Sequence, residues 1–307
     1  MVNHFMQAEL AVPCQNACGE APLWDPVLQS LFWTDCTGLQ FFRFSPASGA
    51  WEMLRSGVEI YGFRKNRPGG FVITNLSGVW LWDLEGAMTP VLTALEGQPC
   101  QANDCTADSR GRFITATFYY NPAGGYQLGK LISLGPEGRV QILDDGYHLA
   151  NGLALSPDEK ILYATDTAAR KIYAYDYDIE TGLACRRRVL VETGPQEGIP
   201  DGLAVDSEGN LWSAQWYGAC VVRYDPGGAV LGRVAVPAKQ VSSMAFGRAD
   251  LTDLYITTAA KPEPMPLMPQ GYDPEQGPFG GPVYRVRTET AGLPAREAAI
   301  SIRGARP

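Results

Sequence analysis

The fold of this chain is decided by a stretch that reads "IPDGLAVDSEGNLWSAQ" at residues 199–215. The letters "GLAV" form a short apolar run, "DSEGN" is rich in turn residues, and "LWSA" begins a second apolar run. Two short apolar runs joined by a turn predict a β-hairpin. Asp201 does not fit this simple pattern, because it places a charged side chain at the start of a strand that the pattern predicts to be buried.

The same pattern recurs at intervals along the chain. Each copy has an apolar run, a turn and a second run with an aromatic residue, and further strand-like runs follow it. Repeats of this length with four strands each are typical of propeller blades. The sequence therefore predicts an all-β fold, a six-bladed β-propeller with four-stranded antiparallel blades around a central channel, over residues 1–307. The copies begin at Glu20, Tyr61, Asn103, Asn151, Asp201 and Ser242, with separations of 41, 42, 48, 50 and 41 residues.

The two ends of the chain are predicted to close the ring together. An incomplete last blade would leave an exposed strand edge, which proteins avoid. The segment "QAELAV", residues 7–12, has the composition of a strand, and the last blade contains "PVYRVR", residues 282–287. We therefore expect the N-terminal strand to pair with the blade that contains the second segment.

Composition excludes several classes of partner. The net charge of −8 and the pI of about 4.9 argue against binding to nucleic acid or to an anionic membrane. No apolar run approaches the roughly 20 residues of a membrane span, and the first residues lack a signal-peptide pattern. The seven cysteines are scattered, so reduced thiols in a cytoplasmic protein are predicted, with one local disulfide left open. A monomer and a homodimer both fit these features.

The six repeat starts are expected to meet around the channel axis, because the innermost strands of all blades line it. At least four of the six carry a side-chain oxygen, and two of them, Glu20 and Asp201, are acids. Carboxylate and amide oxygens are the ligands that hard divalent cations prefer. Without a cation the two acids would repel each other in a partly desolvated pocket. Asx turns explain single asparagines, but they do not explain a pattern that repeats in register.

Five stretches in order resemble one protein family over about residues 17–287. They are "GEAPLWDP", "QANDCTADSRGRF", "NGLALSPDEKILYATD", "PDGLAVDSEGNLW" and "SSMAFGRADLTDLYITTA". These are similar to the gluconolactonase, regucalcin (senescence marker) and luciferin-regenerating family. The resemblance implies one catalytic divalent metal at the channel mouth, which calcium, zinc, manganese or magnesium can provide. It places the metal on Glu20, Asn151 and Asp201, with Asn103 contacting the substrate, and it implies hydrolysis of sugar lactones.

The sequence departs from the family pattern at three positions that we expect beside the mouth. Gln101 stands where the family often has an arginine, Cys105 stands in place of a glycine, and residues 116–118 read Ala-Thr-Phe in place of Gly-Thr-Met. These changes leave the predicted metal ligands intact and bear on the substrate. The residues predicted to bind substrate are Gln101, Asn103, Tyr120 and Asn121.

The predicted chemistry is lactone opening by metal-activated water. A cation polarises the carbonyl and makes its bound water more acidic. Asp201 is predicted to serve as metal ligand and, through its free oxygen, as the base that takes the proton from water. Two alternatives stay open at this point. One is hydrolysis of another ester or a phosphotriester on the same site, and the other is a non-catalytic metal- or ligand-binding propeller.

Two further features bear on function. The chain has only two histidines, so a Ser-His-Asp triad is not favoured. His148 lies three residues before Asn151 and could approach the mouth, but we favour an ordinary loop residue. Residues 261–282 contain seven prolines and four glycines, which exclude helix and central strand. This segment is predicted to be either a lid over the mouth or a surface crossover packed only on its own blade.

Overall fold

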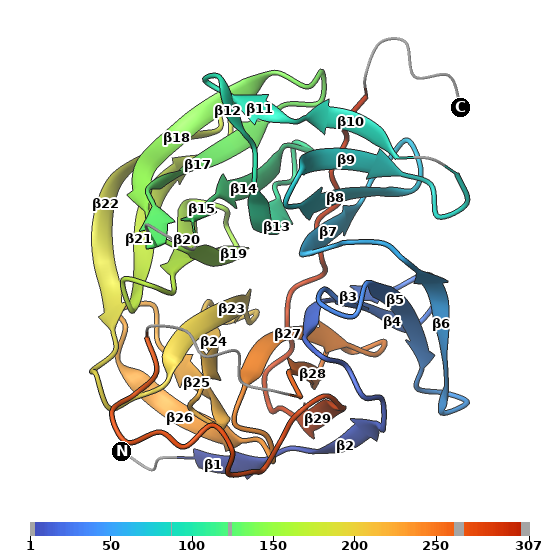
Figure 1. The fold of residues 1–307 in the computed structure, drawn as a ribbon, viewed down its shortest axis with the longest axis vertical. Helices are drawn as coiled ribbons and strands as arrows, with labels where there is room; N and C mark the ends of the chain where they lie inside the picture. Colours follow the sequence, from blue (N-terminus) through green and yellow to red (C-terminus); the bar gives the residue numbers. More distant parts are fainter. Residues whose placement is uncertain (1–3, 87, 122–124, 261–266, 302–307) are drawn as a thin grey trace.

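The computed structural model describes residues 4–86, 88–121, 125–260 and 267–301. Six four-stranded antiparallel units surround a central axis, so the predicted six-bladed β-propeller is confirmed (Figure 1). The described residues form strands and turns without a helix, so they contain no helix of the length and apolarity that a membrane span needs.

The first three blades follow one another along the chain, each beginning with its innermost strand. Two short hairpins, β11–β12 (Ala94–Leu95, Gln98–Pro99) and β15–β16 (Tyr119–Asn121, Gly125–Gln127), interrupt them. Blade 1 consists of β3 (Gly19–Asp25), β4 (Ser30–Asp35), β5 (Gln40–Ser45) and β6 (Ala50–Ser56). Blade 2 consists of β7 (Gly62–Lys65), β8 (Phe71–Asn75), β9 (Gly78–Trp82) and β10 (Thr89–Leu92). Blade 3 consists of β13 (Ala102–Ala107), β14 (Phe113–Thr117), β17 (Gly129–Leu134) and β18 (Val140–Tyr147).

The last three blades include both strands from the N-terminal end. Blade 4 consists of β19 (Ala150–Leu155), β20 (Ile161–Asp166), β21 (Lys171–Asp178) and β22 (Leu183–Glu192). Blade 5 consists of β23 (Ile199–Val205), β24 (Leu211–Trp216), β25 (Cys220–Tyr224) and β26 (Val230–Ala235), with β1 (His4–Gln7) added in parallel to β26. Blade 6 consists of β27 (Val241–Gly247), β28 (Asp253–Thr258), β29 (Val283–Arg287) and β2 (Glu9–Val12).

The ring closes through the N-terminal segment, as predicted. Strand β2 pairs antiparallel with β29, with Glu9 opposite Arg285. The two side chains also form an ion pair of 2.7 Å. Figure 1 shows the blue N-terminal strands beside the orange and red strands of blades 5 and 6. The edges of two blades are therefore covered by a segment that lies far from them in sequence.

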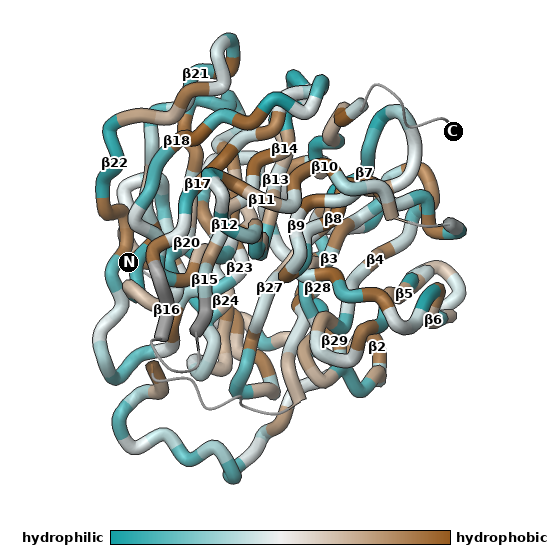
Figure 2. The backbone as a smooth tube through the Cα atoms, turned by 45° about the horizontal axis from the view of Figure 1, so that its top comes forward, coloured by the Kyte–Doolittle hydropathy of each residue, from teal (hydrophilic) through white to brown (hydrophobic). Residues whose placement is uncertain are grey.

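The hydrophobic core lies between neighbouring blades. The second strand of blade 1, β4, is buried along its whole length, and the same holds for β24 and β28. Aromatic side chains fill the space between blades 1 and 2, where the ring centroids of Phe41 and Phe63 lie 5.0 Å apart and those of Phe41 and Trp82 lie 5.2 Å apart. Figure 2 shows the hydrophobic residues gathered in the strands of the ring and many hydrophilic residues in the projecting loops.

Each innermost strand begins at one end of the channel, which we call the mouth. A C-terminal segment, residues 288–301, crosses the opposite end from blade 6 towards blades 2 and 3 (Figure 1). It makes an antiparallel bridge between Gly292 and Asp206 and a parallel bridge between Ala298 and Asn66. This segment covers the far end of the channel.

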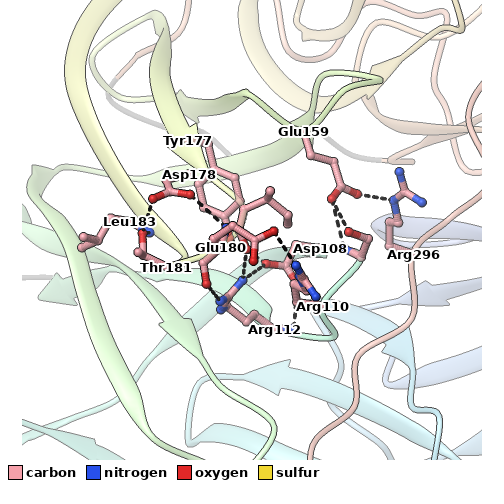
Figure 3. Close-up of polar contacts among 12 residues, drawn as sticks. Asp108, Arg110, Arg112, Glu159, Tyr177, Asp178, Glu180, Thr181, Leu183 and Arg296 are labelled. Carbon is pink, nitrogen blue, oxygen red and sulfur yellow. Dashed lines mark hydrogen bonds and ion pairs between the residues drawn. The ribbon is translucent and has the colours of Figure 1, made fainter.

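Charged contacts hold the far end together. Arg296 of the C-terminal segment pairs with the buried Glu159 of blade 4, and Asp108 of blade 3 pairs with Arg112 at 2.8 Å (Figure 3). Above the segment, the inner strands and residues 293–296 line a cavity of about 120 Å³. The channel is therefore closed at one end, which leaves the mouth as the end where the predicted site residues lie.

We expect deletion of residues 1–12 to lower the melting temperature by at least about 5 °C, or roughly 2 kcal/mol for a chain of this size. The deletion removes β2 and exposes the edge of β29. The measurement is thermal unfolding followed by circular dichroism. Deletion of residues 1–8 is the matched control, because it removes β1 and keeps β2, and it should cost less. An unchanged melting curve for the longer deletion would show that the closure does not stabilise the ring.

Candidate functional site

A β-bulge at the start of the innermost strands explains the polar residues in the repeat. The pairing register shifts between Glu20 and Leu23 in blade 1 and between Pro200 and Leu203 in blade 5. Blades 3, 4 and 6 have the same irregularity at the equivalent place, whereas blade 2 pairs regularly. A bulge leaves a residue outside the ladder and changes the direction of its side chain. Asp201 occupies this position in blade 5.

Glycine follows the site residue where inner strands approach closely. A Cβ atom on Gly152 would lie 2.4 Å from the backbone nitrogen of Leu203. A Cβ atom on Gly202 would lie 2.4 Å from the Ser243 hydroxyl. These distances are far shorter than any real contact, so only glycine allows the neighbouring inner strands to come this close. The site residues of successive blades are thereby brought near one another.

The two predicted asparagines are in direct contact. Asn103 Nδ2 donates to the carbonyl of Ala150 at 2.9 Å and to Asn151 Oδ1 at 3.2 Å. Asn151 Nδ2 donates to the Thr167 hydroxyl at 3.1 Å, and that hydroxyl donates to the carbonyl of Pro200 at 2.8 Å. This chain of hydrogen bonds links blades 3, 4 and 5 and fixes the orientation of both amides. Thr167 was not predicted from the sequence, because it follows the second strand of its blade and does not stand at a repeat start.

Asp201 is a buried carboxylate and Glu20 is a half-buried one, and both have few partners. The Asp201 side chain is almost completely buried, and in the described part of the chain its Oδ1 has no hydrogen-bond partner. Glu20 Oε2 accepts one hydrogen bond, from the backbone of Ala21 at 3.1 Å. Burial raises the pKa of Glu20 to about 8, and repulsion from Asp104 adds to the shift. Burial, followed by repulsion from Glu20, holds the pKa of Asp201 well above its ordinary range.

Asp104 is a third acid that the sequence pattern did not single out. It lies in the bulge of blade 3, directly after Asn103, and its Oδ1 accepts from the backbone of Cys105 at 2.6 Å. Burial raises its pKa, and the positive charge of Arg64 opposes the shift. The only sequence signal was the pair Asn-Asp at a repeat start.

These residues fit a divalent cation. A buried carboxylate oxygen without a partner, a second carboxylate close enough to repel it and an oriented amide are oxygen donors of the kind that hard cations take. In the residues that the structure describes, no three His, Cys, Asp or Glu side chains form a metal-ligand group. The candidate site therefore depends on amide oxygens beside the two carboxylates.

The residues predicted to bind substrate are placed only in part. The backbone carbonyl of Gln101 accepts from Phe118 at 3.0 Å at the mouth side of blade 3. Tyr120 and Asn121 have their backbone in β15, and their side chains lie outside what the structure describes. Their contact with substrate stays a prediction.

Two residues of the departures from the family pattern, Cys105 and Ala116, face the core instead of the mouth, which corrects the expectation for them. Phe118, in the same departure as Ala116, lies beside Gln101 on the mouth side of blade 3. Cys105 and Ala116 are completely or almost completely buried. Cys105 packs in the core between blades 2 and 3, and Ala116 packs in the core between blades 3 and 4. The bulge before Cys105 turns its side chain into the blade interface. Cys105 and Ala116 therefore affect packing, and Gln101 and Phe118 are left as the departures on the mouth side.

The proline-rich segment is described from Leu267 onwards, and residues 261–266 lie outside the described residues. Arg170 of blade 4 donates to the carbonyl of Leu267 at 2.9 Å. The ring of Tyr272 lies 4.6 Å from that of Tyr217 in blade 5. The alternative in which the segment packs only on its own blade is therefore wrong. A lid function stays a prediction.

The fold and the site define a class, namely a six-bladed β-propeller with carboxylates and amides gathered at the mouth of its channel. The family model described as SMP-30/Gluconolactonase/LRE-like region matches residues 18–260, and the chain belongs to this family. It is 36% identical to a pentonolactonase of Haloferax volcanii over 78% of this chain and 81% of that protein. It is 34% identical to a 6-deoxy-6-sulfogluconolactonase of Pseudomonas putida over 80% of this chain and 84% of that protein.

The fold likeness extends to a solved structure. A luciferin-regenerating enzyme superposes with a TM-score of 0.82 at 26% identity, covering 95% of this chain and 98% of the other. The family resemblance inferred from five motifs is thus confirmed.

We expect Glu20→Gln, Asn151→Ala and Asp201→Ala each to weaken binding of a divalent cation by about tenfold or more. Each substitution removes one of the three predicted oxygen ligands. Asn103→Ala should change the affinity for the cation less, because its Nδ2 atom supports Asn151 from the side. Isothermal titration with calcium, manganese and zinc gives the affinities. Unchanged affinity in all of the first three variants would show that the cation binds elsewhere.

The buried acids also predict how stability depends on pH when cations are removed. The pKa of Glu20 in the folded protein is about 8 and its ordinary value is 4.5. Folded protein therefore binds more protons than unfolded protein between these values. The stabilising contribution is fully present below pH 4.5 and is lost as the pH rises through about 8. In EDTA, the melting temperature should fall from pH 5 to pH 8, and it should fall less in Glu20→Gln. Parallel curves for the two proteins would contradict this assignment.

Proposed function

We propose that the protein is a divalent-metal-dependent hydrolase that opens lactones of sugar acids. The observation that carries the proposal is the unpaired, buried Oδ1 of Asp201, which lies close enough to Glu20 to be repelled by it. The hydrogen-bonded Asn103–Asn151 pair stands on the neighbouring inner strands. Two relatives above 30% identity over most of the chain are named lactonases, a pentonolactonase and a 6-deoxy-6-sulfogluconolactonase. The site and the relatives together favour this bond type.

Glu20, Asn151 and Asp201 would hold the cation. When bound, a divalent cation polarises a carbonyl and makes a water molecule more acidic. An all-oxygen donor set suits calcium, magnesium and manganese, and zinc also accepts such ligands. Ligation would also keep Glu20 and Asp201 ionised, because the positive charge offsets the repulsion between them.

The chain's own side chains would then bind the lactone and accept a proton. Asp201 would take the proton of the attacking water on the oxygen that does not bind the cation. Asn103 uses Nδ2 for Ala150 and Asn151. Its Oδ1 has no hydrogen-bond partner among the described residues, and it would accept a hydrogen bond from a substrate hydroxyl.

From Gln101 we infer a lactone substrate that has fewer hydroxyls than gluconolactone, or a different substituent, at that side. An arginine offers a fixed fork of donors and a permanent charge, whereas glutamine offers one carbonyl and one amide nitrogen. A charge-assisted hydrogen bond is worth about 1.5–3 kcal/mol and a neutral one about 1 kcal/mol. The difference corresponds to about one order of magnitude in affinity.

All seven cysteines are free thiols. Free thiols suit a reducing compartment, and on that basis we place the protein in the cytoplasm.

The test is hydrolysis of a panel that contains gluconolactone, pentonolactones, deoxy lactones, a simple ester and a phosphotriester. We expect lactone hydrolysis that EDTA abolishes and added cation restores, and little turnover in Asp201→Ala. A preference for the ester or the phosphotriester would mean that the enzyme cleaves that bond and that a lactone is not its substrate. Absence of hydrolysis together with cation binding would favour a binding protein and would refute the enzyme.

Gln101→Arg tests the substrate within the same panel. The wild type should have a higher kcat/KM for a pentonolactone or deoxy lactone than for gluconolactone, and the variant should shift towards gluconolactone by about tenfold. The idea fails if the wild type already prefers gluconolactone and the substitution leaves the preference unchanged.

A further inference from the structure

His148 lies at the mouth and is held by a buried acid. It occupies the connection between β18 and β19, three residues before Asn151. Its Nδ1 lies 3.1 Å from Oδ2 of Asp166. The imidazole is 51% exposed, whereas the Asp166 side chain is fully buried. One nitrogen of the ring is thus fixed to the protein, and the other side of the ring is open to solvent.

Asp166 is a rigid anchor next to the candidate site. It accepts backbone hydrogen bonds from His148 at 3.0 Å, Leu149 at 3.1 Å and Ala169 at 3.2 Å. The next residue, Thr167, holds the side chain of Asn151. His148 and Asn151 are therefore attached to consecutive residues at the end of β20, and the imidazole belongs to the surroundings of the candidate site.

Blade 1 shows that this turn does not need a histidine. At the equivalent position Asp35 accepts backbone hydrogen bonds from Ala17 at 2.7 Å, Cys18 at 2.9 Å and Gly38 at 2.8 Å. Ala17 stands there where blade 4 has His148. The carboxylate completes its structural task with backbone groups alone. The imidazole of His148 is therefore not needed to hold the equivalent turn in blade 4.

We propose that His148 is a catalytic residue that donates a proton to the leaving oxygen of the lactone. A buried carboxylate on Nδ1 fixes the orientation of an imidazole and leaves Nε2 for proton transfer. This inference rests on the proposed lactone hydrolysis. It adds a proton donor for the second step, in which the bond to the ring oxygen breaks.

The proton transfers balance in the following way. The oxygen of water forms a bond to the carbonyl carbon, and Asp201 receives the proton of that water. The bond between the carbonyl carbon and the ring oxygen then breaks. The ring oxygen takes the proton from Nε2 of the doubly protonated imidazole and leaves as a hydroxyl. His148 regains its proton from solvent, to which half of the ring is exposed, and Asp201 releases its proton to solvent.

Two lactones with different leaving groups distinguish proton donation by His148 from a structural role of this residue. The alkoxide released by δ-valerolactone needs a proton, whereas the phenolate released by dihydrocoumarin, with a pKa of about 10, leaves without one. Neither lactone carries sugar hydroxyls, so contacts to hydroxyls do not enter the comparison. His148→Gln should reduce kcat for δ-valerolactone by about 10² to 10⁴ and kcat for dihydrocoumarin by less than about threefold. Free imidazole should restore turnover of δ-valerolactone in His148→Ala.

The controls separate failure of this proposal from failure of the proposed function. The affinity for cation and the melting temperature should be unchanged in His148→Gln, and His4→Gln, at the only other histidine, should behave as wild type. Equal losses on both lactones, or no loss on either, overturn the role of His148 while the hydrolase stands. A wild type that opens only the aryl lactone also overturns it. A wild type that opens no lactone overturns the proposed function and this inference together.

Discussion

The structure depends on one constraint, the close approach of six innermost strands around a common axis. Neighbouring strands come so near that a methyl group on Gly152 or Gly202 would meet backbone or side-chain atoms at 2.4 Å. A regular strand could not place large polar side chains there. The bulge at the start of five of the six strands takes one residue out of the ladder. Asp201 is charged at the start of a buried strand because the bulge directs it away from the blade core.

The same constraint creates the electrostatic character of the mouth. Glu20, Asp104 and Asp201 come from three different blades, and burial raises the pKa of each. The packing between the blades holds them in place, because moving one acid away would require displacing a whole strand. The large apolar interfaces between blades thus stabilise an arrangement of charges that is unfavourable by itself. Such an arrangement favours any ligand that brings positive charge, and this is the physical basis of the proposed cation site.

The repeat period made the ring, its closure by β2 and the convergence of the polar positions predictable, because strands, turns and their spacing are local features of sequence. Cys105 and Ala116 were misplaced for a physical reason. For Cys105, the repeat shows where along the blade the residue lies, but a bulge changes which side its side chain faces, and the sequence does not show the bulge. Ala116 lies in a regularly paired part of β14, and its side chain faces the interface between blades 3 and 4. Thr167 and Asp166 were missed because they belong to the second strand region, whose contacts with the first form only when the blade folds.

A second ring of polar residues surrounds the first, and in blades 1 and 4 it fixes the loops at the mouth. The ends of the second strands carry buried polar side chains, and in blades 1 and 4 these carboxylates bind the backbone that leads into the inner strand. The loop is therefore fixed whatever side chain stands on it, as the pair Ala17 and His148 shows. Chemistry at the mouth can change by single substitutions on loops that keep their shape. The residues of this outer ring are Asp35, Asn75, Thr117, Asp166, Gln215 and Thr258.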